Sequence, residues 1–139
     1  MIKRDALDAV FSDLIREAHD WTCARCGREF PDRKGQDAHC SHFYSRKYNS
    51  TRWFPDNAVL LCASCHRITT DDHHEHVRLF ESLLGETRYA MLVERKAKLF
   101  RYHKADKDAM KAHYKSQLEN LKAHRTRGAT GVLAVAAYD

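Results

Sequence analysis

Two identical cysteine pairs constrain this sequence more than any other feature. Cys23 and Cys26 form one C-x2-C pair, and Cys62 and Cys65 form the other. Two such knuckles can present four thiolates at the corners of a tetrahedron, which is the geometry that structural Zn²⁺ adopts. Because sulfur fills all four positions, no position is left for water or substrate. We therefore predict a structural zinc ion that clamps a small core.

The setting of the cysteines favours a metal site over disulfides. The N-terminus, MIKRDALDAVFSDL, lacks the apolar stretch of a signal peptide. No apolar run approaches the roughly 18–20 residues that span a membrane. We therefore expect a soluble, cytoplasmic protein with no membrane partner, in a compartment that keeps thiols reduced. Cys40 lies outside both pairs and is predicted to be a small, half-buried residue.

Length and apolar periodicity predict a single mixed domain. The 139 residues, 43% of them hydrophobic, are enough for one modest core. Gly85 is a candidate helix C-cap. Turn formers dominate residues 28–57, where we expect short strands and loops, and the apolar run 58–61 predicts a buried strand or turn. Helices are expected over residues 5–19, 65–84, 87–102 and 105–125.

These elements divide the chain into one domain, residues 1–127, and a tail, residues 128–139. The tail lacks periodicity, and we predict that it is flexible, either disordered or docked on a neighbour. The parts expected within the domain are an N-terminal helix at 1–20, a zinc-clamped core at 21–76 and a basic helical extension at 77–127.

Positive charge is concentrated in the C-terminal third of the chain. Residues 95–127 carry eleven Lys or Arg and three Asp or Glu, whereas residues 1–94 carry thirteen against fifteen. Such a concentration is typical of a surface that faces a polyanion, although a solvated helix face would look the same. The lysines predicted to contact DNA from this region are Lys107, Lys111 and Lys115.

The interval between the knuckles is long and contains candidate catalytic residues. Thirty-five residues separate Cys26 from Cys62, well beyond the roughly 15–20 of a simple four-cysteine ribbon. Its middle reads AHCSHFYSRKYNSTRW. Hydrolysis of a phosphodiester needs a general base, and neutral histidine can serve at pH 7. His42 precedes Asn57 by fifteen residues and His66 by twenty-four, and His66 directly follows the last zinc cysteine.

The order of His42, Asn57 and His66 between and after the knuckles resembles the HNH nucleases, whose catalytic unit is a ββα-metal finger. The resemblance covers residues 21–70 through the strings CARCG, HF, PDN and LCASCH. Within that superfamily, HFYSRKYNSTRW followed by Asn and C-x-x-C resembles the phage NinG/Rap recombination nucleases. The Ref-type phage nuclease is a related comparison, and the arrangement of knuckles around a histidine is also similar to phage endonuclease VII.

The resemblance implies metal-dependent cleavage of DNA. For NinG/Rap it implies action on recombination intermediates such as Holliday junctions and D-loops, by a phage protein in the cytoplasm of its bacterial host. The implied fold is α+β, with a small zinc-stabilised HNH ββα-metal or treble-clef core, a preceding N-terminal helix and two or three C-terminal helices. The implied cofactors are a structural Zn²⁺ and a catalytic Mg²⁺ or Mn²⁺. A homodimer would suit a two-fold junction.

The resemblance also assigns roles to individual residues. His42 becomes the general base, and Asn57 becomes the residue that holds the histidine-bearing loop. His66 becomes a ligand of the catalytic ion. Arg46 is grouped with the catalytic residues because it matches a basic position of the family block. The loop residues expected to contact DNA are Arg46, Lys47 and Arg52.

The rest of the catalytic metal site stays open at the level of sequence. Many HNH sites place a metal-binding Asp or His immediately before the base, where this chain has Ser41. His39 is the candidate for a second ligand of the ion, and His39 could also exchange roles with His42. Other residues that could complete the ion are Asp37, Asp71, Asp72 and His73.

Several alternative interpretations stay open beside the nuclease hypothesis. A zinc module with these residues could bind DNA without cutting it, or an HNH nuclease could serve in nicking or DNA packaging. His73, His74 and His76 could form a second metal cluster, although a solvated helix start is the more ordinary interpretation. Trp53 and Phe54 are expected in the core, with base stacking as the alternative.

Overall fold

The N-terminal helix is set by a cap that its own sequence supplies. In the computed structural model, which describes residues 2–138, helix α1 spans Ala6–Ala18. The Asp5 carboxylate accepts from the Asp8 N–H, and the Asp8 carboxylate accepts from the Asp5 N–H, which makes a reciprocal capping box. The predicted apolar face is buried, with Phe11 at its centre. The helix therefore begins and packs where the sequence predicts.

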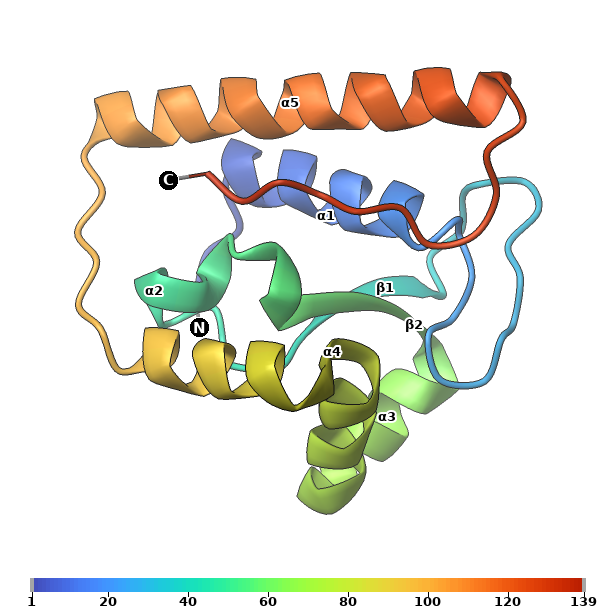
Figure 1. Ribbon diagram of the computed structural model, residues 1–139, viewed down its shortest axis with the longest axis horizontal. Helices are drawn as coiled ribbons and strands as arrows, with labels where there is room; N and C mark the ends of the chain where they lie inside the picture. Colours follow the sequence, from blue (N-terminus) through green and yellow to red (C-terminus); the bar gives the residue numbers. More distant parts are fainter. Residues whose placement is uncertain (1, 139) are drawn as a thin grey trace.

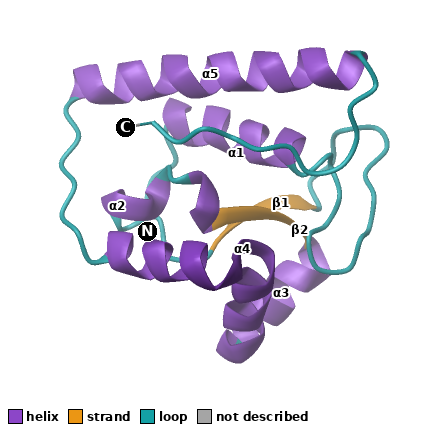
Figure 2. Ribbon diagram, viewed as in Figure 1, coloured by secondary structure: helices purple, strands orange, loops and turns teal. Residues whose placement is uncertain are grey.

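A two-stranded antiparallel sheet lies at the centre of the molecule, and the helix after it extends from one end of the sheet (Figure 2). Strand β1 spans Ala38–His42 and strand β2 spans Ala58–Cys62, with His39 opposite Leu61. Every residue of β2 is buried, and helix α3, Ala63–Asp71, follows it without a loop. The predicted fold class is confirmed: the fold is mixed, and its small ββα core carries a four-cysteine cluster that can bind zinc.

The connection between the two strands contains two short helical turns. Helix α2 spans Asn49–Arg52, and a 3₁₀ turn, Pro55–Asn57, leads into β2. Trp53 lies between them and is 4% exposed, so it belongs to the core as expected. Phe54 is half-buried beneath the Arg95 guanidinium. Neither ring is presented to solvent for base stacking.

The single helix predicted over residues 65–84 is divided into two helices in the structure. The helix expected over residues 65–84 is interrupted at Asp72, whose carboxylate caps α4, His73–Lys96, by accepting from the His74 N–H. Gly85 ends the first part of α4 at φ +80°, which confirms it as a stop signal.

The helix expected over residues 87–102 ends early, so that prediction was wrong at its C-terminal end. Residues 97–103 form the connection to α5, and Leu99, expected as an apolar anchor, is fully exposed. Phe100 and Tyr102 pack on one another, with ring centroids 5.9 Å apart. In an extended chain, side chains two residues apart point to the same side. Burial of these two aromatics therefore overrides the helical periodicity.

Helix α5, Lys104–Thr126, lies alongside α1 and covers it (Figure 1). Tyr114 packs edge-on against Phe11 with ring centroids 5.3 Å apart, and its hydroxyl donates to the Trp53 carbonyl. Met110 and Leu121 complete this contact. A second apolar cluster surrounds β2 and includes Phe80 and Leu92 of α4. The sheet is thus held between two cores.

The C-terminal segment runs back over the molecule. The Leu133 N–H donates to the Ala18 carbonyl at 2.9 Å, and the Gly131 N–H donates to Asp20 at 2.8 Å. Leu133, Val135 and Tyr138 pack against the α1–α5 cluster. The segment predicted to be a flexible tail is therefore docked on its own chain in this structure. Residues 1 and 139, which belong to the predicted domain and tail, lie outside the described residues.

No helix within residues 2–138 combines the length and the apolar character that crossing a membrane requires.

Candidate functional site

The four paired cysteines converge as the knuckle spacing predicts. Within residues 2–138, Cys23, Cys26, Cys62 and Cys65 are the only cluster of three or more His, Cys, Asp or Glu side chains placed to share an ion. Their sulfur atoms all lie within 4.8 Å of one another. Gly27 closes the first knuckle at φ +79°, and its N–H donates to the Cys23 carbonyl. The cluster can hold a structural zinc ion, with one knuckle at the end of β2 and the start of α3.

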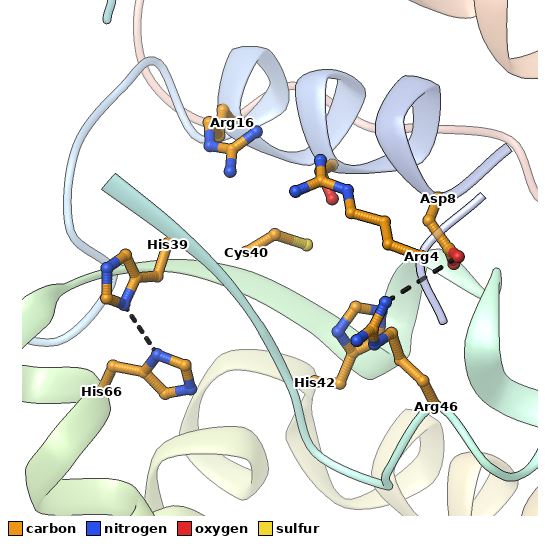
Figure 3. Close-up of a pocket in the computed structure, with 9 residues that line it drawn as sticks. Arg4, Asp8, Arg16, His39, Cys40, His42, Arg46 and His66 are labelled. Carbon is orange, nitrogen blue, oxygen red and sulfur yellow. Dashed lines mark hydrogen bonds and ion pairs between the residues drawn. The ribbon is translucent and has the colours of Figure 1, made fainter. Parts of the chain in front are cut away.

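A second candidate site is a cavity of about 410 Å³ between α1 and β1 (Figure 3). Its walls come from three separate parts of the chain. The N-terminal region supplies one wall, β1 and the following loop supply the opposite wall, and α3 closes one end. The lining residues are Arg4, Asp8, Ser12, Arg16, His39, Cys40, His42, Arg46 and His66.

His39 and His66 meet at one end of this cavity. Their Nδ1 atoms are 2.8 Å apart, and their rings are nearly perpendicular at 79°. Two imidazole lone pairs cannot face each other at that distance unless a proton or a cation lies between them. Burial lowers the pKa of His66, and the charge of His39 lowers it further, so a metal ion meets neutral imidazole there more readily. The pair is therefore suited to share a divalent ion.

His42 lines the same cavity from the last position of β1. Its Nε2 lies 3.2 Å from the Arg52 carbonyl oxygen, which can only accept a hydrogen bond. The neutral ring must then carry its proton on Nε2, which leaves the lone pair on Nδ1. Burial lowers the pKa of His42 to about 4. The side chain is thus neutral at pH 7 and able to accept a proton.

Asn57 holds the loop that follows His42. The side chain is fully buried, and its Nδ2 donates to the carbonyls of Tyr44 and Thr51, each at 3.1 Å. Its Oδ1 accepts from the Tyr44 N–H at 2.9 Å, and its carbonyl accepts from the Phe43 N–H. These bonds fix residues 43–51 against the start of β2. The role of Asn57 in positioning His42 for catalysis stays a prediction.

The loop cations separate into different settings. Arg46 lines the cavity, with Nη1 3.8 Å from Asp8. Arg52, predicted to contact phosphate, instead gives both Nε and Nη2 to Asp8 and stacks on Trp53, and its side chain is only 11% exposed. Its environment favours a structural role, because moving it to DNA would strand a buried carboxylate. Lys47 is exposed over the Tyr48 ring and does not line the cavity.

The C-terminal lysines do not reach the cavity. Lys107 pairs with Asp5 at 2.7 Å, and Lys111 lies near it along the same groove beside the start of α1. Lys115 is exposed farther along α5. Helix α1 stands between α5 and β1 in Figure 1, so these residues are separated from the histidines. Their contact with DNA stays a prediction.

The open question of the second metal ligand narrows to His39. Ser41 is 1% exposed and does not line the cavity. Asp37 is 3.7 Å from Arg28. The remaining alternatives, Asp71, Asp72 and His73, are exposed and also lie outside the cavity lining. Of these candidates, only His39 is hydrogen-bonded to His66.

The run of histidines after Asp72 does not form a metal cluster within the described residues. His73 and His74 are exposed, in keeping with a solvated helix start. His76 instead packs against Phe43, with ring centroids 4.9 Å apart.

The N-terminal region contributes a wall of the cavity that was not predicted from the sequence. Arg4, Asp8, Ser12 and Arg16 recur every four residues, which is the spacing of one helical face. This polar spacing is visible in the sequence, but the apolar periodicity of the same helix is the stronger pattern. Asp8 is 4% exposed and also accepts from Trp53 Nε1 at 3.0 Å.

Comparison with known proteins points to one superfamily. Residues 23–72 match the family profile described as HNH endonuclease. This segment is about a third of the chain, and it includes the four paired cysteines and the three residues whose order suggested the family. No curated protein and no solved structure matches the chain. The match supports a nuclease or DNA-binding function in general, with DNA as the substrate that such a domain implies.

Proposed function

We propose that this HNH-domain protein is a metal-dependent endonuclease that hydrolyses DNA phosphodiester bonds, with branched recombination intermediates as its substrates. One observation supports the proposal most directly. A neutral histidine with a free Nδ1 lone pair, His42, lines the same cation-rich cavity as the His39–His66 pair.

In this reading, His42 is the general base. Its Nδ1 takes a proton from water as the water oxygen bonds to phosphorus and the bond to the leaving sugar oxygen breaks. The Arg52 carbonyl holds the ring in the tautomer that this step needs, and Asn57 holds the loop between them. Arg46, at the cavity wall, is placed to bind a phosphate oxygen.

His39 and His66 would hold the catalytic ion. When bound, such an ion stabilises the charge that develops on the phosphate and on the leaving oxygen. Two imidazole donors suit Mn²⁺ better than Mg²⁺, which prefers oxygen ligands. With only two protein donors, coordination positions stay open for water and phosphate. This openness is what a catalytic site needs.

The proposed preference for branched DNA rests on the NinG/Rap resemblance and on the kind of residues in the cavity. Among the described residues, the lining contains no Phe, Tyr or Trp that could stack on a base. Cations that contact phosphate carry little sequence information. We therefore propose recognition of DNA shape and backbone, by a chain that pairs as a homodimer on two-fold junctions.

The test compares cleavage of a Holliday junction, a D-loop and linear duplex, each with Mg²⁺ or Mn²⁺. We expect cutting of the branched substrates, faster with Mn²⁺, and a loss of roughly 10²–10⁴-fold in His42→Ala. His74→Ala is the matched control, because His74 is an exposed histidine outside the cavity. Tight binding without cutting would leave a non-catalytic DNA-binding module. Equal cutting of all three substrates would exclude a preference for branches, as expected of a nicking or packaging nuclease.

A further inference from the structure

The wall opposite the histidines comes from a part of the chain that the HNH match does not include. Arg4 and Arg16 lie before residue 23, and both line the cavity together with Asp8 and Ser12. Figure 3 shows both guanidinium groups beside α1, across the cavity from His39 and His42. The cavity is thus bounded by imidazoles on one wall and by guanidinium groups on the other.

The charge of Arg4 is not neutralised by an ion pair within residues 2–138, whereas Arg16 pairs with Asp13. Arg4 makes no hydrogen bond or ion pair within the described residues, although its guanidinium group is directed into the cavity. Among the described residues of the lining, Asp8 is the only acidic one, and its carboxylate is already engaged by Arg52. The cavity therefore carries uncompensated positive charge beside the histidines.

Arg16 is held in place rather than free. Its Nε donates to the Ala38 carbonyl at 2.8 Å, and its Nη1 pairs with Asp13 at 3.2 Å. The side chain is 16% exposed. These contacts fix the guanidinium plane at the entry of β1 and leave Nη2 as a donor. A fixed arginine with a spare donor loses little freedom when it binds an anion.

We infer that Arg4 and Arg16 form a second phosphate-binding wall, which grips the DNA backbone next to the phosphate that the histidines address. The inference rests on the proposed function for its ligand. Guanidinium groups match phosphate oxygens in charge and in planar donor geometry. Helix α1 therefore contributes part of the substrate site, and the segment over residues 23–72 is incomplete without it.

The experiment measures binding separately from cleavage. Binding of a labelled (dT)20 strand is followed from low to moderate salt, without added Mg²⁺ or Mn²⁺, using the full zinc-containing chain with His42→Ala. Each phosphate contact to a single strand contributes a slope of about −0.7 in log K against log salt. We expect Arg4→Gln with Arg16→Gln to reduce the slope by about 1.4, and Arg4→Gln alone by about 0.7. Affinity at low salt should fall by about tenfold or more in the double variant.

Two controls separate charge from structure. Arg78→Gln removes an arginine on α4 that pairs with Glu75 outside the cavity, so slope and affinity should stay unchanged. Arg4→Lys with Arg16→Lys keeps the charge and should restore most of the slope. Arg4 has no partner within residues 2–138, so its substitution should leave thermal unfolding unchanged and give a clean measurement.

The results can distinguish this inference from the proposed function. An unchanged slope in Arg4→Gln and in the double variant overturns the phosphate wall, even if the wild type cuts DNA. If Arg78→Gln reduces the slope as much as Arg4→Gln does, the phosphate wall is also overturned. If the wild type cuts nothing but the slope falls as expected, the wall stands and the nuclease proposal fails.

Discussion

The sulfur cluster and the histidine cavity are neighbours in the chain but opposite in design. Cys65 is a zinc-site cysteine and His66, the next residue, belongs to the cavity. The cluster offers four sulfur atoms and closes around an ion, whereas the cavity offers two nitrogens and stays open toward cationic walls. One turn of α3 thus couples a closed structural site to an open site suited to chemistry.

The two sites also differ in what supports them. The cluster is built from residues 23–65 alone, around two local turns. The cavity needs α1, which precedes the first knuckle, and Asp8 links that helix to the strand region through Arg52 and Trp53. We therefore expect damage to the cluster to affect the whole fold, and damage to the cavity to affect ligand binding first.

The largest expected effect is loss of the cluster. Cys65→Ser removes one of four sulfur ligands, and structural zinc contributes about 10–16 kcal/mol in small zinc-dependent folds. We expect loss of cooperative unfolding by circular dichroism, together with loss of bound zinc. Cys40→Ser is the control and should keep one zinc ion per chain. A cooperatively folded, zinc-free Cys65→Ser protein would contradict the structural role.

The next effect comes from Asp8, which joins the two halves of the cavity. Asp8→Asn leaves the buried Arg52 guanidinium without its counter-charge, which typically costs about 3–5 kcal/mol. Urea unfolding measures the change. Asp13→Asn, at an exposed carboxylate of the same helix, should cost less than about 1 kcal/mol. Similar losses in both variants would show that Asp8 is an ordinary surface carboxylate.

The contribution of Asp8 to the free energy of unfolding should also depend on pH. Burial alone would raise the pKa of Asp8, but the hydrogen bonds from Arg52 and Asp5 and the charge of Arg52 together outweigh it and lower the pKa from 3.8 to about 2. A lowered carboxyl pKa stabilises the fold above pH about 4, and this contribution of about 2–3 kcal/mol is lost as the pH falls from about 4 to about 2. Denaturant melts across this range measure it. If Asp8→Asn keeps the full acid sensitivity, another carboxylate is responsible.

Loss of a cavity ligand should leave the fold intact. His39→Ala removes one of the two nitrogens offered to the catalytic ion. We expect the Mn²⁺ concentration for half-maximal cleavage to rise at least about tenfold, since even the outer partners of metal ligands are worth 10–100-fold. Bound zinc and the melting temperature should not change. An unaltered Mn²⁺ requirement would leave His66 without the partner that the geometry gives it.

The smallest expected effect is a shift in the pH profile. Burial lowers the pKa of His42 to about 4, so the base is already neutral well below pH 6. The cleavage rate should therefore stay level from pH 7 to about pH 5 and fall below that, as the base becomes protonated. The fraction of folded protein must be monitored in the same samples. A rate that halves near pH 6.5 would mean that the titrating base is an ordinary, solvated histidine.

The sequence predicted those features that depend on local spacing. Each C-x2-C knuckle, the buried strand 58–61 and the stop at Gly85 follow from residues close together in the chain, and the structure has them. Asn57 and His66 also lie where the motif order places them, one fixing the loop after His42 and the other beside His39. Short-range patterns fix short-range geometry.

The features that were missed depend on contacts between distant residues. Arg52 matched a basic family position, but its partner Asp8 lies 44 residues earlier, and only packing of α1 on β1 brings them together. The same packing places Arg16 in the cavity. The helix expected to run to 102 ends at Lys96 because Phe100 and Tyr102 gain more by packing from an extended chain.

The docking of the last residues on the first helix has a consequence for synthesis. Helix α1 packs on α5, about a hundred residues later, and the Ala18 carbonyl accepts from Leu133. During translation the first helix must wait, with its apolar face uncovered, until residues 104–133 have left the ribosome. The cysteine knuckles can close long before that. We therefore expect a nascent chain to hold metal early, and to complete the cavity wall only after residues 104–133 have emerged.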